Sequence, residues 1–300
     1  MTEGVPIVNI EAPPDTGEST ENEAIDLYKI LRTPADDNLE KEYAWLQQIR
    51  CLQVIDRVTR ALKGIGRHLN IGNKMDPRMG IPPSEAKTQR LELGSKSGAD
   101  QVKAVISLLS DNVISCEISL KHSKSPGGIY RGVAQPEVQW KLQQLQDLSN
   151  FIAKTSFILV EAQSRAKELF QGQKWDRIGG AIIHQSIKEA RNALSSAQNA
   201  MVLPRKRTLL DLCQFPPTKK FNPSFPIDQI VSIYASGPRL ICAVYQMNPK
   251  QPIGSGKDIG VVSAECIIPG MPQVLQRIAG SLRIMQEFLN EMEALRPKLP

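Results

Sequence analysis

Histidine and aromatic residues are scarce in this sequence. Its 300 residues include three histidines, and Phe, Trp and Tyr together make up 5% of the chain. His68, His122 and His184 fall in different predicted elements, and none stands beside a carboxylate or cysteine at the spacing of a catalytic triad or metal site. We therefore expect no metal, no cofactor, no small-molecule substrate and no catalytic residues, so an enzyme is the least favoured class.

The five cysteines also lack the spacing of a functional site. They stand at positions 51, 116, 213, 242 and 266, with no CxxC pair and no nearby histidine to complete a zinc set. An odd number of widely spaced cysteines is typical of reduced thiols that pack as small hydrophobic side chains.

Long hydrophobic runs are absent as well. Charged residues interrupt every apolar segment well before the roughly 20 residues that a membrane span needs. The first residues lack the basic and apolar blocks of a signal peptide. We expect a cytoplasmic protein without a transmembrane segment.

One glycine-rich stretch, PIGSGKDIG at 252–260, invites comparison with a phosphate-binding loop. Gln251 stands where the leading glycine is needed, and Asp258 replaces the Ser or Thr that binds magnesium. A strand-like segment follows, where a phosphate-binding loop would begin a helix. The stretch therefore predicts a connection between two strands.

Charge is distributed unevenly along the chain. Residues 1–37 hold nine acidic side chains against Lys29 and Arg32, a net charge of −7, and since the whole chain carries +6, residues 38–300 carry +13. The acidic segment is poor in aromatics and rich in Pro and Thr, so we expect a disordered tail. The basic remainder suits nucleic acid, anionic lipid or an acidic protein face.

Apolar spacing predicts four helices. The first begins at the N-cap Asn38 and ends near the glycines of KGIG at 63–66, with an apolar stripe that includes Trp45, Leu52, Ile55 and Leu62. The second runs from about Pro136 to 170, and the third from 176 to 198. The last helix, at 269–295, has the strictest period, with apolar residues at 271, 275, 278, 282, 285, 289 and 292.

Strand patterns fill the segments between the helices. Three antiparallel strands are predicted within 88–122, with a tight turn at Ser110, Asp111 and Asn112. A hairpin that turns at 236–238 and a further strand at 261–268 follow the third helix.

Grouping like elements predicts an elongated α+β fold. A discontinuous four-helix bundle contains the N- and C-terminal helices together (38–66, 136–200 and 269–296), and a small antiparallel β domain contains 86–122 and 203–268. Four amphipathic helices can cover one another's stripes, and dimerisation through the last helix is the alternative.

Two surfaces are candidate partner interfaces. The second helix offers Gln139, Gln143, Gln144 and Gln146, whose neutral amides bury at lower desolvation cost than charges do; a solvated face is the alternative. Trp140 either packs between bundle and sheet or anchors a partner.

The second surface is a basic connector. Arg205, Lys206 and Arg207 are of the kind that nuclear import or polyanion contact uses, with a solvated linker as the alternative.

The opening of the second helix also carries a family resemblance. QWKLQQLQD at 139–147 and GADQVKAVISL at 98–108 resemble the Rogdi family. Further similar pieces follow in order between residues 40 and 295: EKEYAWLQ, KEARNAL, FPIDQIVSIY, LICAVYQM and AECIIP.

This resemblance implies a curved molecule with a helical part, built from both chain ends, and a β domain. It also implies a non-enzymatic role as the small subunit of a RAVE-type complex, with a large WD-repeat partner of the rabconnectin type. Such complexes promote assembly of the cytosolic sector of the vacuolar proton ATPase onto its membrane sector, so the protein would be recruited peripherally to endosomal or vacuolar membranes. No catalytic residues are carried over.

A second hypothesis comes from charge alone. The +13 body with Arg205, Lys206 and Arg207 would suit a basic, nucleic-acid-associated nuclear protein. No zinc finger, aromatic stacking platform or recognition helix accompanies these residues, so nucleic acid is the less favoured partner.

Overall fold

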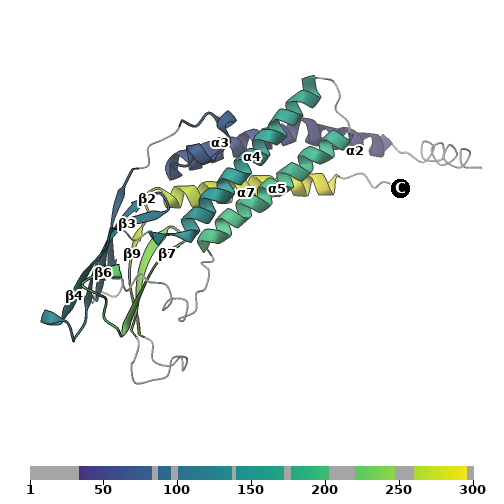
Figure 1. The fold of residues 1–300 in the computed structure, drawn as a ribbon. Helices are drawn as coiled ribbons and strands as arrows, with labels where there is room; N and C mark the ends of the chain where they lie inside the picture. Colours follow the sequence, from purple (N-terminus) through teal and green to yellow (C-terminus); the bar gives the residue numbers. More distant parts are fainter. Residues whose placement is uncertain are drawn as a thin grey trace, which may run out of the picture.

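The computed structural model describes residues 34–82, 87–95, 101–136, 140–171, 177–202, 220–246 and 260–295. Figure 1 shows an elongated molecule with long helices at one end and a curved sheet at the other. The α+β fold predicted from the sequence is confirmed.

A long, nearly continuous helix opens the described chain. It consists of α2 (Pro34–Trp45), a single π-helical segment η1 (Leu46–Arg50) and α3 (Cys51–Leu69). The predicted end at KGIG is wrong, because the helix continues through both glycines and is closed by Asn70, whose φ of 54° is left-handed. Gly66 is needed inside the helix because a Cβ there would overlap the sulfur of Met75.

The predicted stripe of this first helix is wrong at Trp45. Trp45 is 51% exposed, while the next residue, Leu46, is buried. A π-helical turn contains more residues than an α-helical turn, so η1 rotates the buried face relative to a regular period. Ile55 and Leu62 are fully buried as expected.

Helices α4 (Gln143–Gln171) and α5 (Arg177–Val202) form an antiparallel pair beside α3 (Figure 1). Five apolar residues at alternating spacings of four and three along α5 are all buried: Ile183, Ile187, Ala190, Leu194 and Ala197. The predicted start of α4 at Pro136 is wrong. Trp140–Lys141 instead form the short strand β5, which pairs with β3, so the helix begins only at Gln143.

Helix α7 (Met271–Ala294) completes the bundle by packing against α3 and α5. Its buried face is rotated from the predicted one and consists of Met271, Val274, Ile278, Ser281, Met285, Phe288 and Met292. Leu275, Leu282 and Leu289 are half-buried against the same core. The stripe is thus covered within the chain, as the bundle hypothesis expected. Near the far end, Arg50 Nε of η1 lies 3.3 Å from Glu291 Oε2.

The connection after α3 is fixed to α4 by polar contacts. It contains two short 3-10 helices, η2 (Gly72–Lys74) and η3 (Pro77–Met79). The buried Asp76 donates its backbone N–H to Ser156 Oγ at 3.1 Å. Its carboxylate accepts from Arg78 Nε at 3.1 Å and Nη2 at 2.8 Å, and these hydrogen bonds lower the pKa of Asp76.

The described strands form one antiparallel sheet. In chain order they are β1 (Gln89–Ser95), β2 (Val102–Leu109), β3 (Asn112–Lys121), β4 (Ile129–Ala134), β5 (Trp140–Lys141), β6 (Phe221–Asn222), β7 (Gln229–Ser236), β8 (Arg239–Gln246) and β9 (Gly260–Ile267). In space the order is β6-β4-β3-β2-β1-β9-β8-β7, with β5 added at β3. The sheet curls into a half-barrel.

Most predicted strands are confirmed. The β2–β3 turn contains Ser110 with a φ of 58°, and the β7–β8 hairpin turns at Gly237 and Pro238. The strand predicted after the glycine-rich stretch is β9; residues 252–259 themselves lie outside the described chain. Strand β4 was not predicted.

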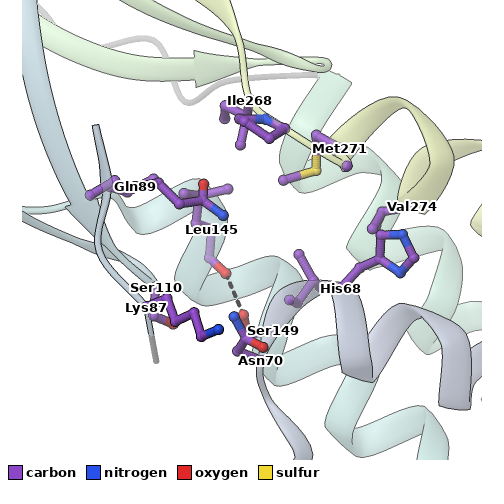
Figure 2. Close-up of a pocket in the computed structure, with 14 residues that line it drawn as sticks. His68, Asn70, Lys87, Gln89, Ser110, Leu145, Ser149, Ile268, Met271 and Val274 are labelled. Carbon is purple, nitrogen blue, oxygen red and sulfur yellow. Dashed lines mark hydrogen bonds between the residues drawn. The ribbon is translucent and has the colours of Figure 1, made fainter. Parts of the chain in front are cut away.

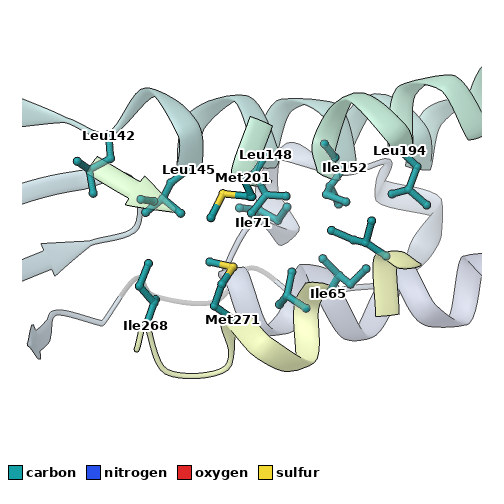
Figure 3. Close-up of a cluster of buried hydrophobic side chains, with 14 of the residues drawn as sticks. Ile65, Ile71, Leu142, Leu145, Leu148, Ile152, Leu194, Met201, Ile268 and Met271 are labelled. Carbon is teal, nitrogen blue, oxygen red and sulfur yellow. The ribbon is translucent and has the colours of Figure 1, made fainter. Parts of the chain in front are cut away.

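A single hydrophobic core runs through both ends of the molecule. The inner face of the sheet supplies Leu91, Ile106, Cys116 and Leu240, which belong to the same buried cluster as the bundle stripes. Figure 3 shows the junction, where Leu142, Leu145, Met201, Ile268 and Met271 gather between the start of α4, the end of α5 and the start of α7. The bundle and the sheet are therefore packed together through this junction.

Candidate partner-binding surface

The glutamine surface predicted from the sequence lies at the start of α4, beside the junction. Gln143, Gln144 and Gln146 are all half-buried, and Gln143 Nε2 donates to Asp147 Oδ1 at 2.7 Å one turn along the helix. Gln139 lies outside the described residues. Three of the four glutamines thus lie within the first turn of α4.

Trp140 is positioned by strand pairing. It lies opposite Val113 in β3, is half-buried, and packs against the core. The following residue, Leu142, donates its N–H to Asp111 O at 2.8 Å. Trp140 therefore helps attach α4 to the sheet. The remaining candidates, Arg205, Lys206 and Arg207, lie outside the described residues.

A small cavity opens at the same junction (Figure 2). Its volume is about 50 Å³, and its polar lining includes His68, Asn70, Gln89 and Ser149. Ser149 Oγ already donates to Leu145 O at 2.8 Å. Because one water needs roughly 10–15 Å³, the cavity has room for a few waters and is too small for a metabolite.

Sequence reasoning missed one polar cluster, because its members are far apart in the chain. His122 Nδ1 lies 2.9 Å from Ser125 Oγ, and His122 Nε2 lies 3.2 Å from Asp228 Oδ1. Lys124 Nζ donates to Asp228 Oδ2 at 3.0 Å. Burial would raise the pKa of Asp228, but the hydrogen bond and charge of Lys124 outweigh burial and lower it.

This cluster contains the three residue types of a hydrolytic triad. Ser125 and His122 belong to one turn, however, and the aspartate is shared with Lys124. None of them lines the cavity at the junction. The contacts join the β3–β4 turn to the start of β7, so the cluster acts as a clamp at the tip of the sheet.

Three of the cysteines are buried, and their thiols are held in the protonated form. Burial raises the pKa of Cys51 and Cys242 to about 12 and that of Cys116 well above its ordinary value, so these thiols stay protonated. Cys213 lies outside the described residues. Within the part of the chain that the structure describes, no group of three or more His, Cys, Asp or Glu is arranged to hold a metal ion.

Comparison with known protein families matches most of the chain. Residues 54–283 match the family model described as "Rogdi leucine zipper containing protein". The chain belongs to the Rogdi family. The match spans the sheet, α4 and α5, and includes every predicted interface position from Gln139 to Arg207. It ends inside α7, whose heptad leucines pack within the chain's own bundle.

Three Rogdi relatives show how far the similarity extends. The chain is 38% identical to "Protein rogdi homolog" of Caenorhabditis elegans over 268 residues, which cover 88% of this chain and 91% of that protein. It is 27% identical to the Homo sapiens "Protein rogdi homolog" over 279 residues, covering 85% and 91%. Similarity to "Protein rogdi" of Drosophila melanogaster is 29% over 148 residues, covering 49% and 52%.

None of the described helices is both long and apolar enough to cross a bilayer.

Proposed function

We propose that the chain is a non-enzymatic subunit of a RAVE-type complex. In this role it binds a large WD-repeat partner of the rabconnectin type and promotes assembly of the cytosolic sector of the vacuolar proton ATPase onto its membrane sector. The observation that carries the proposal is membership of the Rogdi family across residues 54–283. The protein then acts in the cytoplasm and reaches endosomal or vacuolar membranes through its partners.

The fold supports a role in holding partners. A bundle closed by both ends of the described chain and a sheet joined to it through one core make a long molecule with two dissimilar surfaces. We propose that the helical part (38–66, 136–200 and 269–296) and the β part (86–122 and 203–268) act as two binding units. Rigid packing at the junction would hold their partners at a fixed separation.

We propose that the partner interface includes the start of α4 and the basic connector. Gln143, Gln144 and Gln146 are half-buried already, so a partner could cover them with little loss of side-chain freedom. Gln139 and Trp140 precede these glutamines in the sequence and belong to the proposed interface, and Arg205, Lys206 and Arg207 would add positive charge for an acidic face.

Affinity purification of the tagged chain from its own cells tests the assembly role. We expect recovery of a WD-repeat protein and of cytosolic proton ATPase subunits, and a raised vacuolar pH when the chain is removed. Recovery of neither partner would overturn the proposal.

A variant with Gln143, Gln144 and Gln146 changed to Ala tests the interface. It should recover less WD-repeat partner at unchanged thermal stability. The matched control changes Gln163, Gln185 and Gln198 to Ala, where Gln185 also donates to a residue one turn along its helix, at 3.1 Å. Equal losses in both variants would rule out this interface.

A further inference from the structure

Helices α3 and α7 lie side by side in opposite directions. Arg50, just before α3, contacts Glu291 at the end of α7, and His68 at the end of α3 lies beside Gly270 at the start of α7. Between these contacts, nearer to His68 and Gly270, the guanidinium of Arg277 lies over Gly64. The two helices therefore share one outer face along the length of α3.

This outer face carries a row of arginines. Positions 57, 60, 64 and 67 recur at intervals of three and four, so they form one stripe on the exposed side of α3. Arg57, Arg60 and Arg67 are exposed and occupy three of the four positions. Gly64 occupies the fourth, and Arg277 from α7 lies over it.

Glycine is what allows this arrangement. A Cβ at position 64 would overlap the Arg277 side chain. Glycine within a helix costs about 1 kcal/mol relative to alanine, and like charges at these spacings repel. The stripe thus gathers four cations at a cost in local stability. We call Arg57, Arg60, Arg67 and Arg277 the arginine stripe.

Helix dipoles do not account for the whole stripe. Arg67 lies in the last turn of α3, where a cation is favourable. Arg57 and Arg60 lie further from that end, and Arg277 lies nearer the N-terminal end of α7, where a cation gains nothing from the dipole. Among the described residues, Arg60 Nη2 pairs with Asp56 Oδ2 at 2.7 Å on the same helix.

We propose that the arginine stripe binds an extended acidic polypeptide segment of a partner. The stripe from Arg57 to Arg67 is about 15 Å long, which an extended chain covers with about five residues. Guanidinium groups form paired hydrogen bonds with carboxylates, which favours arginine over lysine in this role.

A membrane surface fits the stripe less well. The large exposed hydrophobic residues of the described chain include Trp45 and Ile49 before α3, but none within α3 or α7. The face thus offers no apolar side chain to enter a bilayer.

Fluorescence anisotropy of a labelled oligo-glutamate peptide with the full chain tests the proposal at physiological ionic strength. Changing Arg57, Arg67 and Arg277 to Ala should weaken binding about tenfold. The control changes Lys121, Arg131 and Lys141 to Ala, three exposed cations of the sheet, and should bind as the wild type does. Absence of binding by the wild type, or equal weakening in both variants, would overturn the proposal.

Gly64→Ala separates binding from folding. Alanine is the better helix residue, so the variant should be at least as stable as the wild type. Its methyl group displaces Arg277, and peptide binding should therefore weaken. Unchanged binding would contradict the place of Arg277 in the stripe.

Two other polyanions complete the test. Phosphatidylserine–phosphatidylcholine vesicles and duplex DNA of random sequence are titrated against the same variants. If the wild type binds vesicles or DNA more tightly than the peptide, and if the arginine substitutions abolish that binding, then that polyanion and not an acidic segment is the ligand. The stripe stands apart from the proposed ATPase role, since peptide binding would hold even if no ATPase subunit were recovered.

Discussion

The helical bundle and the tip of the sheet are both closed by residues far apart in the chain, but through different contacts. In the bundle, Ile278, Met285 and Phe288 of α7 are buried against α3 and α5. At the tip, His122 meets Asp228 at 3.2 Å and Tyr130 Oη donates to Pro223 O at 2.6 Å. The bundle should therefore respond to changes of side-chain volume, and the tip to pH and to loss of hydrogen bonds.

The largest effect is expected from Phe288→Ala. Phe288 is 1% exposed, so truncation leaves a cavity in the bundle and should lower the free energy of unfolding by about 3–5 kcal/mol. Phe157, at 47% exposed, is the matched control, and its change to Ala should cost far less. Urea denaturation measures both. Similar losses at the two positions would mean that the buried packing of Phe288 does not hold α7 in the bundle.

A smaller effect is expected at the tip from Asp228→Asn. Losing the carboxylate that faces His122 and Lys124 should cost about 1–2 kcal/mol at neutral pH. The pKa of Asp228 is lowered in the folded protein, so its contribution is present above the unfolded pKa and is lost as pH falls through the folded value.

Urea midpoints across a pH series check this sign. The gap between wild type and Asp228→Asn should be constant near neutral pH and should shrink below about pH 4. A gap that widened on acidification would show that the tip is not held by this ion pair. Asp56→Asn, in an exposed pair with Arg60, is the control and should change little.

Tyr130→Phe isolates one hydrogen bond at the tip. The ring remains 4.8 Å from that of Phe225, but the donor to Pro223 O is lost. We expect a loss of about 1 kcal/mol. Hydrogen exchange should accelerate in residues 221–230 and remain unchanged in α7. Faster exchange in α7 would show that the sheet tip and the bundle do not open independently.

The smallest change is expected inside the bundle and in the opposite direction. Thr59 Oγ1 is buried and has no hydrogen-bond partner among the described residues, so Thr59→Val should leave stability unchanged or raise it by up to about 1 kcal/mol. Thr155 is also buried, but its Oγ1 donates to Phe151 O at 2.8 Å. Thr155→Val should therefore destabilise the protein, and equal shifts in melting temperature would contradict this distinction.

Local patterns predicted the elements whose partners are near in sequence. The β2–β3 turn and the β7–β8 hairpin depend on turn residues and alternation. The stripe of α5 follows from its regular period. These elements could be predicted because the side chains that determine them are neighbours.

Features that depend on distant partners could not be predicted. Gly64 and Gly66 resemble a helix end, yet α3 continues to Leu69, and the side chains of Arg277 and Met75 lie over the two glycines. Trp140 falls within the range predicted for the second helix but pairs with β3.

The same limit applied to the candidate site. The glutamines of α4 could be found from their spacing. The His122–Asp228 clamp and the arginine stripe could not, because each combines segments separated by about a hundred residues or more.

Helix α2 starts, and α7 ends, at the same extremity of the bundle, as the contact of Arg50 with Glu291 reflects. Labels placed near positions 50 and 291 would therefore sit close together although 241 positions separate them. A donor–acceptor dye pair there would transfer energy efficiently in the native protein and lose that transfer once α7 detached, which gives a direct optical readout of bundle opening.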